Sequence, residues 1–223
     1  MRMVVMNHVK QMQDVKGFLQ QIRAMSIDTI LVLGTDQTSQ SGTPELLTNI
    51  TLANDGISRL YQDNPMLCLQ KELQDSRTTW HLGWATQTLY TMSQHGVGVL
   101  TTSQLGVMWQ RVISPHIQMQ VIDLGTYVVG VITVKDTRLV RRSMLQRVHD
   151  LLKAQVKPVL LFGPTIFAAD LEKWGWLSKS DFPQQTLGQV WEQDVWCDCD
   201  GGVTVLQKCS LPERQTGLLI DFK

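Results

Sequence analysis

The hydrophobic and polar positions of the first forty residues predict a strand, a helix and a second strand. MRMVVMNHV, at residues 1–9, is a short apolar run, and the next segment spaces its apolar residues three or four apart, as one face of a helix requires. Those residues are Val15, Phe18, Leu19, Ile22 and Met25. SIDTILVLGTDQTS, at residues 26–39, is rich in β-branched and apolar residues and ends in polar ones, which predicts a strand.

The pattern is less regular over the next fifty residues. Residues 37–63 are rich in Thr, Ser, Asn, Asp and Gly, and a helix is expected to start near Thr43-Pro44-Glu45. PMLCLQKEL, at residues 65–73, fits either a strand or a buried helical turn. TWHLGWATQTLYTM, at residues 79–92, mixes aromatic and polar residues without a clear period. Both segments remain open on sequence alone.

Three β-type runs follow, at residues 95–103, 116–124 and 126–134. The last two, HIQMQVIDL and TYVVGVITV, are separated at Leu124-Gly125-Thr126, which predicts an antiparallel hairpin. The sheet that contains this hairpin is expected to include two more strands, KPVLLFG at residues 157–163 and MRMVVMNHV at the start of the chain.

A helix is predicted at residues 138–155, before the KPVLLFG strand. Its apolar residues share one face, and its arginines lie mostly elsewhere. The apolar set is Leu139, Met144, Val148, Leu151 and Leu152, and the arginines are Arg138, Arg141, Arg142 and Arg147. These arginines are candidates for phosphate binding, although a solvated helix face also explains them. TGLLIDFK, at residues 216–223, is apolar enough to be a closing strand.

Composition limits the function classes. A chain of 223 residues with 43% hydrophobic residues suits one domain, residues 1–223. Lys and Arg number 20, as do Asp and Glu, so net charge does not attract the chain to nucleic acid, and weak or no nucleic-acid binding is expected. Four cysteines do not make a disulfide scaffold, and the start of the chain has no secretory pattern. We therefore expect an intracellular protein that binds no membrane.

The order of these elements resembles the endonuclease/exonuclease/phosphatase superfamily, the DNase I-like fold of apurinic endonucleases, retrotransposon endonucleases and inositol phosphatases. The first strand of that family ends in an Asn of the metal site, and Asn7, near the end of residues 1–9, corresponds to it. GVGVLT, at residues 96–101, is similar to the family's G-V-(A/G)-(I/V)-L-(S/T) strand, and KPVLLFG is similar to the strand that precedes Gly-Asp-x-Asn. The resemblance covers nearly the whole chain and implies a two-sheet α/β sandwich.

Most residues that this family uses for catalysis are replaced here. The metal-binding Glu corresponds to Thr35, beside Asp36, and the Tyr or His of the central hairpin corresponds to Thr133. Pro164 and Ile166 stand in place of the Asp and Asn of Gly-Asp-x-Asn. Gln215 falls where the family has its general-base His. Only Asn7 is retained.

These replacements matter because the family's reaction depends on particular groups: carboxylates hold Mg²⁺, a His–Asp pair activates water, and polar groups orient the phosphate. Proline and isoleucine supply none of these groups. The resemblance thus implies a domain without catalytic residues, metal or cofactor, which serves as a protein-interaction or scaffolding module and has a protein partner. Two alternatives remain. One is a Mg²⁺-dependent nuclease or phosphodiesterase whose site is rebuilt from Asn7, Asp36 and acids such as Asp170 or Asp221, and the other is a nucleic-acid-binding remnant that uses the arginines of residues 138–147.

Two further groups have alternative explanations. Cys197, Cys199 and Cys209, with His116 or His149, have the chemistry of zinc ligands, but their spacing favours ordinary thiols. Four tryptophans gather in the last third of the chain and belong either to the core or to an interaction surface. They are Trp174, Trp176, Trp191 and Trp196.

Overall fold

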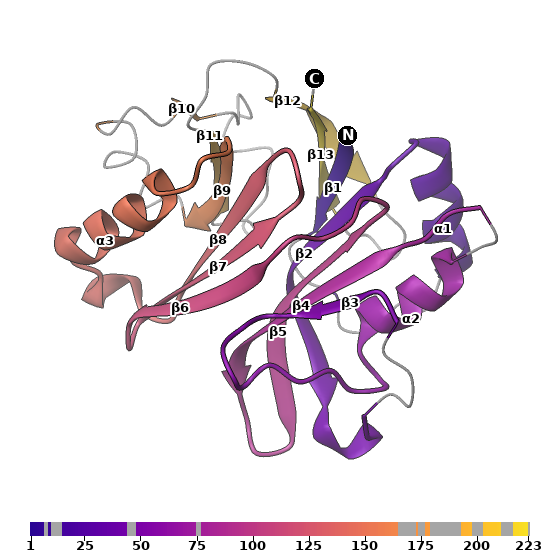
Figure 1. Cartoon of the computed structure of the whole chain (residues 1–223), viewed down its shortest axis with the longest axis horizontal. Coiled ribbons are helices and arrows are strands. Elements are labelled where there is room, and N and C mark those ends of the chain that lie inside the picture. The colour runs from indigo at the N-terminus through magenta and orange to yellow at the C-terminus, as the bar shows by residue number, and fades with distance from the viewer. Residues whose placement is uncertain are drawn as a thin grey trace.

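The protein is a sandwich of two β-sheets with helices on both outer faces (Figure 1). The computed structural model describes residues 1–6, 9, 15–43, 48–74, 77–164, 173, 177–178, 193–197, 203–210 and 216–222. Within these residues the strands form a seven-stranded sheet, sheet A, and a six-stranded sheet, sheet B. The expected two-sheet α/β sandwich is confirmed.

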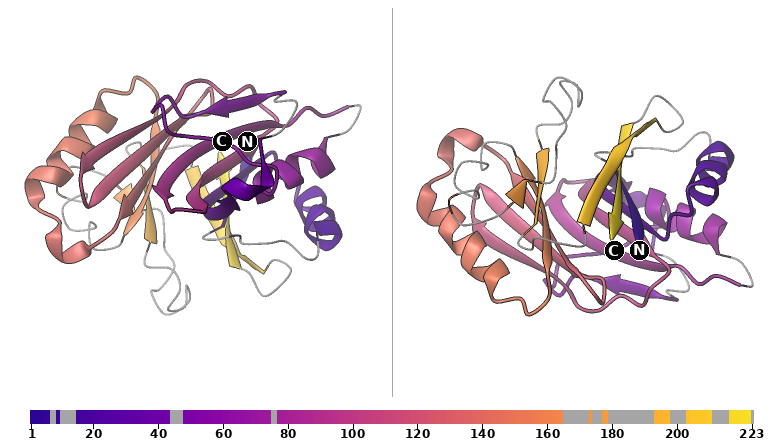
Figure 2. Two further views of the ribbon diagram at one scale, coloured as in Figure 1. Left: turned by 90° about the horizontal axis from the view of Figure 1, so that it is seen from below. Right: turned by 90° about the horizontal axis from the view of Figure 1, so that it is seen from above.

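Sheet A contains both ends of the described chain. Its strand order is β12 (Val203–Ser210), β13 (Thr216–Phe222), β1 (Arg2–Met6), β2 (Thr29–Thr38), β5 (Ser93–Thr101), β4 (His81–Leu89) and β3 (Ile50–Leu52). β1 runs parallel to β2 and antiparallel to β13, so that the two termini lie side by side (Figure 2). The strands predicted at residues 1–9, 26–39 and 216–223 are confirmed, and the segment left open at residues 79–92 forms β4.

Sheet B confirms the predicted hairpin but corrects its neighbours. Its strand order is β10 (Leu177–Ser178), β11 (Gln193–Cys197), β9 (Val159–Pro164), β8 (Val128–Val134), β7 (Ile117–Asp123) and β6 (Met108–Ser114). β7 and β8 pair antiparallel through a turn in which Gly125 has a φ of +87°. The KPVLLFG strand, β9, does join this sheet. The expectation that residues 1–9 join it is wrong, because β1 is paired on both of its edges within sheet A. Strand β6 was not predicted.

Helices cover the outer face of each sheet. α1 (Val15–Ala24) and α2 (Pro65–Leu73) pack on sheet A, and α3 (Arg142–Lys153) packs on sheet B (Figure 1). α2 settles the segment left open at residues 65–73: the Asn64 side chain accepts hydrogen bonds from the backbone N–H groups of Met66 and Leu67, and Pro65 occupies the first turn. Two short 3₁₀ helices complete the described helical segments, at Ser39–Ser41 and Thr137–Leu139. The helix start expected at Thr43-Pro44-Glu45 lies mostly outside the described residues. In the described part of the chain, no helix is both long enough and apolar enough to cross a membrane.

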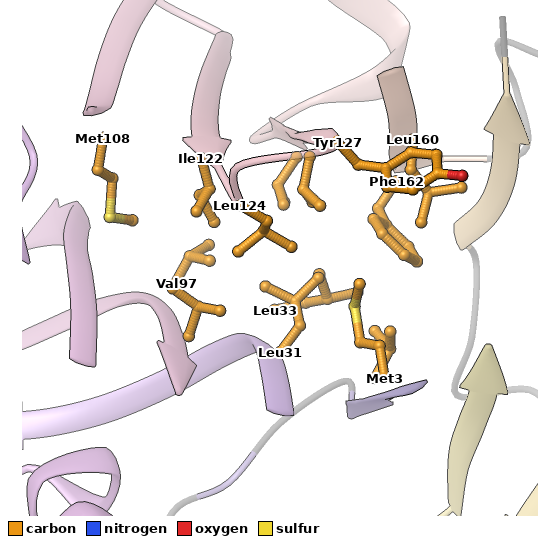
Figure 3. Packing of buried hydrophobic residues seen from close by; sticks show 14 of the residues in the cluster. Met3, Leu31, Leu33, Val97, Met108, Ile122, Leu124, Tyr127, Leu160 and Phe162 are labelled. Carbon is orange, nitrogen blue, oxygen red and sulfur yellow. The ribbon is translucent and has the colours of Figure 1, made fainter. Parts of the chain in front are cut away.

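The main core lies between the two sheets. Side chains from β1, β2 and β5 of sheet A point toward side chains from β6, β7, β8 and β9 of sheet B (Figure 3). Met3, Leu31, Val97, Leu160 and Phe162 belong to this layer, and each is at most 1% exposed. Two further apolar clusters fill the spaces under the helices. Because every central strand buries both faces, polar side chains on these strands are not automatically at the surface.

Gly96 in β5 has no room for a side chain. A Cβ at this position would lie within 3 Å of the backbone oxygen of Ala85 and of the Trp84 ring. We expect Gly96→Ala to destabilise the fold by about 1–3 kcal/mol, toward the upper end because one obstacle is backbone. Urea unfolding measures the effect. Ser103→Ala, at an exposed position just past the same strand, is the control and should leave the midpoint unchanged. Equal midpoints for Gly96→Ala and the wild type would contradict the packing described.

His149 on α3 makes stability depend on pH. It is 8% exposed, and burial, reinforced by the charge of Lys153, lowers the pKa of its imidazole. As pH falls, the unfolded chain therefore takes up a proton on His149 before the folded chain does. The stability that neutral His149 provides is complete at neutral pH and decreases as pH falls through about 6.5, the usual pKa of His. We expect His149→Gln to reduce the slope of unfolding free energy against pH between about 7 and 5, and Lys153→Gln to reduce it less. An unchanged slope in His149→Gln would count against this assignment.

Candidate functional site

The inner face of sheet B changes from apolar to polar toward one end of the sandwich. Strand pairing aligns its side chains in rows across β6, β7, β8 and β9. The first row is Met108, Ile122, Val129 and Leu160, and the second is Gln110, Gln120, Val131 and Phe162. The third row is Val112, Gln118 and Thr133, and Pro164 is the corresponding position on β9, two residues beyond Phe162. Residues that the sequence suggested for the site therefore lie where the apolar interior ends.

A chain of amide side chains closes this end of the interior. Gln87 of β4 reaches across from sheet A, and its Nε2 donates to Gln120 Oε1 at 3.2 Å and to Thr133 Oγ1. Gln120 Nε2 donates to Gln110 Oε1 at 2.7 Å, and Gln110 Nε2 donates to the backbone oxygen of Thr86 at 2.8 Å. We call Gln87, Gln110, Gln120 and Thr133 the amide layer. It joins the two sheets, and Gln110 Nε2 also donates to the Asp55 carboxylate at 3.4 Å.

The amide layer is almost fully withdrawn from solvent. Gln87 is 3% exposed, Gln120 0% and Gln110 7%. Gln87 Oε1 and, next to the layer, Gln118 Oε1 are buried and have no hydrogen-bond partner among the described residues. A buried polar atom without a partner costs about 1–3 kcal/mol. The network is therefore incomplete on its acceptor side.

Asp36 and His95 form a hydrogen-bonded pair close to this layer. They are opposite each other on β2 and β5, and Nδ1 of His95 lies 2.8 Å from Oδ1 of Asp36. His95 in turn is opposite Thr88 of β4, the residue that follows Gln87. Asp36, His95 and the amide layer therefore lie at the same end of the sandwich. Both side chains of the pair are partly exposed, Asp36 at 41% and His95 at 28%.

Thr35 points away from this pair, toward the helices. It is opposite Gly96, whose missing side chain would meet the Trp84 ring in the cluster under α2. Opposed residues on neighbouring strands share a face, and alternation places Asp36 and His95 on the other face, toward sheet B. Thr35 is fully buried, and its Oγ1 has no partner among the described residues. A bulge in β2 between Val32 and Thr35 determines which of the residues beyond it face the helices and which face sheet B.

The structure thus brings together three of the residues that the sequence suggested, Asp36, Thr133 and Pro164, and places Thr35 behind them on the opposite face. Asn7, Ile166 and Gln215 lie outside the described residues, as does Asp170. Asp221 does not belong at this end. Its carboxylate contacts Arg2, which is also beside Asp28, and Asp36 lies eight residues further along β2, on the order of 25 Å away. The suggestion that Asp221 helps rebuild a site with Asp36 is therefore wrong.

Of the four candidate phosphate-binding arginines, Arg138, Arg142 and Arg147 each interact with other groups of the chain. Arg138 donates from Nε and Nη2 to Asp136, and these bonds hold the pKa of the Asp136 carboxyl below its usual value. Arg147 Nη1 donates to the backbone oxygen of Ile113 at 3.2 Å. Arg141 and Arg142 are exposed at the start of α3. Arg138 and Arg147 are therefore already bonded to other groups of the chain, whichever ligand the helix meets.

A divalent metal such as that of the resembled family does not fit the described residues at this end. The carboxylates beside this layer are Asp36, which contacts His95, and Asp55, which accepts hydrogen bonds from Ser58 and Gln110. Each therefore already has partners within the chain, whereas Mg²⁺ needs several oxygen ligands in one octahedral arrangement. Across the described residues no three His, Cys, Asp or Glu side chains gather closely enough to hold a metal. Of the residues considered for zinc or for an aromatic surface, Cys199, Trp174, Trp176 and Trp191 lie outside the described residues.

The amide layer was missed by sequence reasoning. Gln118 and Gln120 alternate with Ile117, Met119 and Val121, a pattern that usually predicts a strand with one face in water. Here the apolar residues pack under α3 and the glutamines face the other sheet. One feature of the sequence could have indicated the layer. The polar positions in the middle of the predicted strand at residues 116–124 are both glutamines, whereas a strand face in water usually carries charged residues as well.

Several solved structures have a fold similar to that of this chain. The chain is similar over 100% of its length to an endonuclease/exonuclease/phosphatase family protein from Leptotrichia buccalis C-1013-b, with a TM-score of 0.69, 11% identity and 99% of that chain covered. A functionally unknown conserved protein from Enterococcus faecalis V583 gives a TM-score of 0.56 at 11% identity, with coverage of 100% and 99%. CdtB, the biologically active subunit of cytolethal distending toxin, gives 0.51 at 8% identity, with coverage of 100% and 97%.

No family model matches the sequence, and neither does any curated protein. At 8–11% identity the structural likeness establishes the fold alone. The chain therefore has the DNase I-like fold that the sequence resemblance implied.

Removing the Gln87 side chain tests whether the amide layer holds the two sheets together. Gln87→Ala deprives Gln120 Oε1 and Thr133 Oγ1 of their donor. We expect a loss of about 1–3 kcal/mol in unfolding free energy, measured by urea denaturation. Gln104→Ala, at an exposed position, is the matched control and should change stability by less than about 0.5 kcal/mol. A double-mutant cycle with Gln120→Ala should show coupling, and strictly additive effects would mean that the two amides do not interact.

Proposed function

We propose that this chain, a DNase I-like fold, has lost phosphoester hydrolysis and acts as a protein-interaction or scaffolding module. The amide layer carries the proposal. Hydrolysis on such a scaffold requires carboxylates, a base and a polar opening between the sheets through which metal and phosphate enter. At the end of this molecule that holds Thr133 and Pro164, buried glutamines bridge the sheets and occupy the space between them.

The residues at the strand ends support the same proposal. Thr133 is bonded to Gln87, and β9 ends in Pro164, which offers neither charge nor a donor. Such a cross-sheet network holds the sheets together, whereas an open catalytic cleft usually lowers stability. A rigid sandwich with a closed end suits a protein whose role is to present surfaces to a partner.

One observation favours a second candidate, a hydrolase with a rebuilt site. The contact between Asp36 and His95 has the geometry that orients an imidazole for general-base catalysis, and both side chains reach solvent. This candidate needs groups beyond the pair to hold a phosphate. Asp36→Asn and His95→Ala therefore separate the two functions.

We expect the purified chain, with Mg²⁺ or Mn²⁺, to leave abasic duplex DNA, supercoiled plasmid, RNA and phosphoinositides intact at the rate of a buffer control. The reason is that, among the described residues, no three side chains of the metal-binding types gather in one place. Gel and phosphate-release assays measure the rate. Turnover that disappears in both Asp36→Asn and His95→Ala, while Gln104→Ala retains it, would establish the hydrolase instead.

A further inference from the structure

The free edge of sheet B combines three features that together make a peptide-binding surface. In the described part of the chain sheet B ends at β6, which pairs with β7 alone. A pocket of about 410 Å³ opens beside this edge. Arg111, which lines the pocket, makes no ion pair or hydrogen bond to the described residues. We propose that β6 binds an extended segment of a partner protein as an added strand, with an acidic side chain of that segment in the pocket.

Backbone direction shows which groups of β6 face outward. The Asn54 N–H donates to Met108 O at 3.0 Å, from the side away from β7, whereas Val107 O accepts from Asp123 N on the β7 side. Alternation along an antiparallel strand then turns the N–H and C=O groups of Gln110 and Val112 outward as well. Met108 O is occupied by Asn54, and Ile113 O accepts from Arg147. The groups of Gln110 and Val112 lie between these two points.

The bulge in β6 does not disrupt this stretch. It falls between Val112 and Ser114, so that residues 109–112 keep regular pairing with β7. Val107, just before this stretch, and Val112, at its end, are 63% and 61% exposed. An edge with exposed apolar side chains and outward backbone groups is the surface to which an extended peptide adds.

The pocket selects the chemistry of the ligand. It lies between β6 and the end of α3, and its lining is Asn54, Val107, Trp109, Gln110, Arg111, Leu151, Ala154 and Gln155. Arg111 is the one charged residue in this set, and its guanidinium lies 6.0 Å from the centre of the Trp109 ring. Trp109 packs against the apolar cluster under α3, which supports the ring from behind. A guanidinium held in this way binds a carboxylate through paired hydrogen bonds.

An added strand would place its side chains alternately on the two faces of sheet B. Those on the α3 side meet the pocket and Arg111, and those on the other side meet Val112. The expected ligand is therefore a strand of alternating residues with one Asp or Glu on the pocket side. This inference rests on the proposed interaction role, but it uses a surface other than the Asp36–His95 end.

Selection of random linear heptapeptides on the full chain, followed by fluorescence anisotropy with the selected peptides, tests the proposal. We expect a consensus with one acidic residue and alternating apolar residues. Arg111→Ala should raise Kd at least tenfold at low salt and Arg111→Lys less, because lysine keeps the charge and loses the paired geometry. Arg23→Ala, an exposed arginine on α1, is the matched control and should leave Kd unchanged.

Peptide chemistry separates strand addition from simple charge attraction without altering the protein. N-methylation of every second peptide amide should abolish binding in one register, where the N–H groups face β6, and leave it within threefold in the other. Hydrogen exchange at Gln110 and Val112 should slow on binding. Equal tolerance of both methylation registers, or a Kd insensitive to Arg111→Ala, would overturn the proposal.

Two other occupants would also overturn it. If peptides do not bind and the chain forms a dimer that Val112→Lys dissociates, a second copy occupies the edge. If inorganic phosphate or a single-stranded oligonucleotide binds through Arg111 and the peptides do not, the pocket recognises phosphate. Hydrolysis assays are independent of all these measurements, so failure of peptide binding and failure of the proposed non-catalytic role remain distinguishable.

Discussion

Face-to-face packing of the two sheets is the constraint on which the rest of the structure depends. Each sheet buries its inner face against the other, and the central strands bury their outer faces under helices. Burial of apolar side chains contributes about 25 cal/mol per Å² removed from water, so this central layer dominates the favourable free energy. It also determines position, because a side chain on the inner face must either pack or find a hydrogen-bond partner on the opposite sheet.

The amide layer is the consequence of that constraint at one end of the sandwich. Gln87, Gln110 and Gln120 lie at positions that the other sheet covers, and each amide satisfies part of its hydrogen-bonding capacity across or along the sheets. Such a network adds little net stability compared with apolar packing, but loss of one member leaves the others buried without partners. The network therefore holds this end of the molecule closed and selects one relative position of the sheets.

Local pattern was sufficient for much of the fold because it reports burial directly. The helical spacing of Phe18, Leu19 and Ile22 and the apolar run that became β13 were interpreted correctly. Pattern was not sufficient for β4, whose outer face carries a buried Trp84 and whose inner face carries Gln87, or for β6, whose short run lacks β-type regularity. The assignment of β1 to the wrong sheet has a related cause, since partner choice depends on segments more than two hundred residues apart, as in the pairing of β1 with β13.

By itself, the sequence determined the type of most elements, their order and the turn at Gly125. Tertiary structure alone decided which strands share a sheet, that Asp36 lies opposite His95 while Thr35 points to the helices, and that glutamines bridge the sheets. The physical reason is that periodicity records whether a position is buried, not what buries it. A bulge of one residue reverses the face of every side chain beyond it, and the pairing of distant strands decides which polar groups meet.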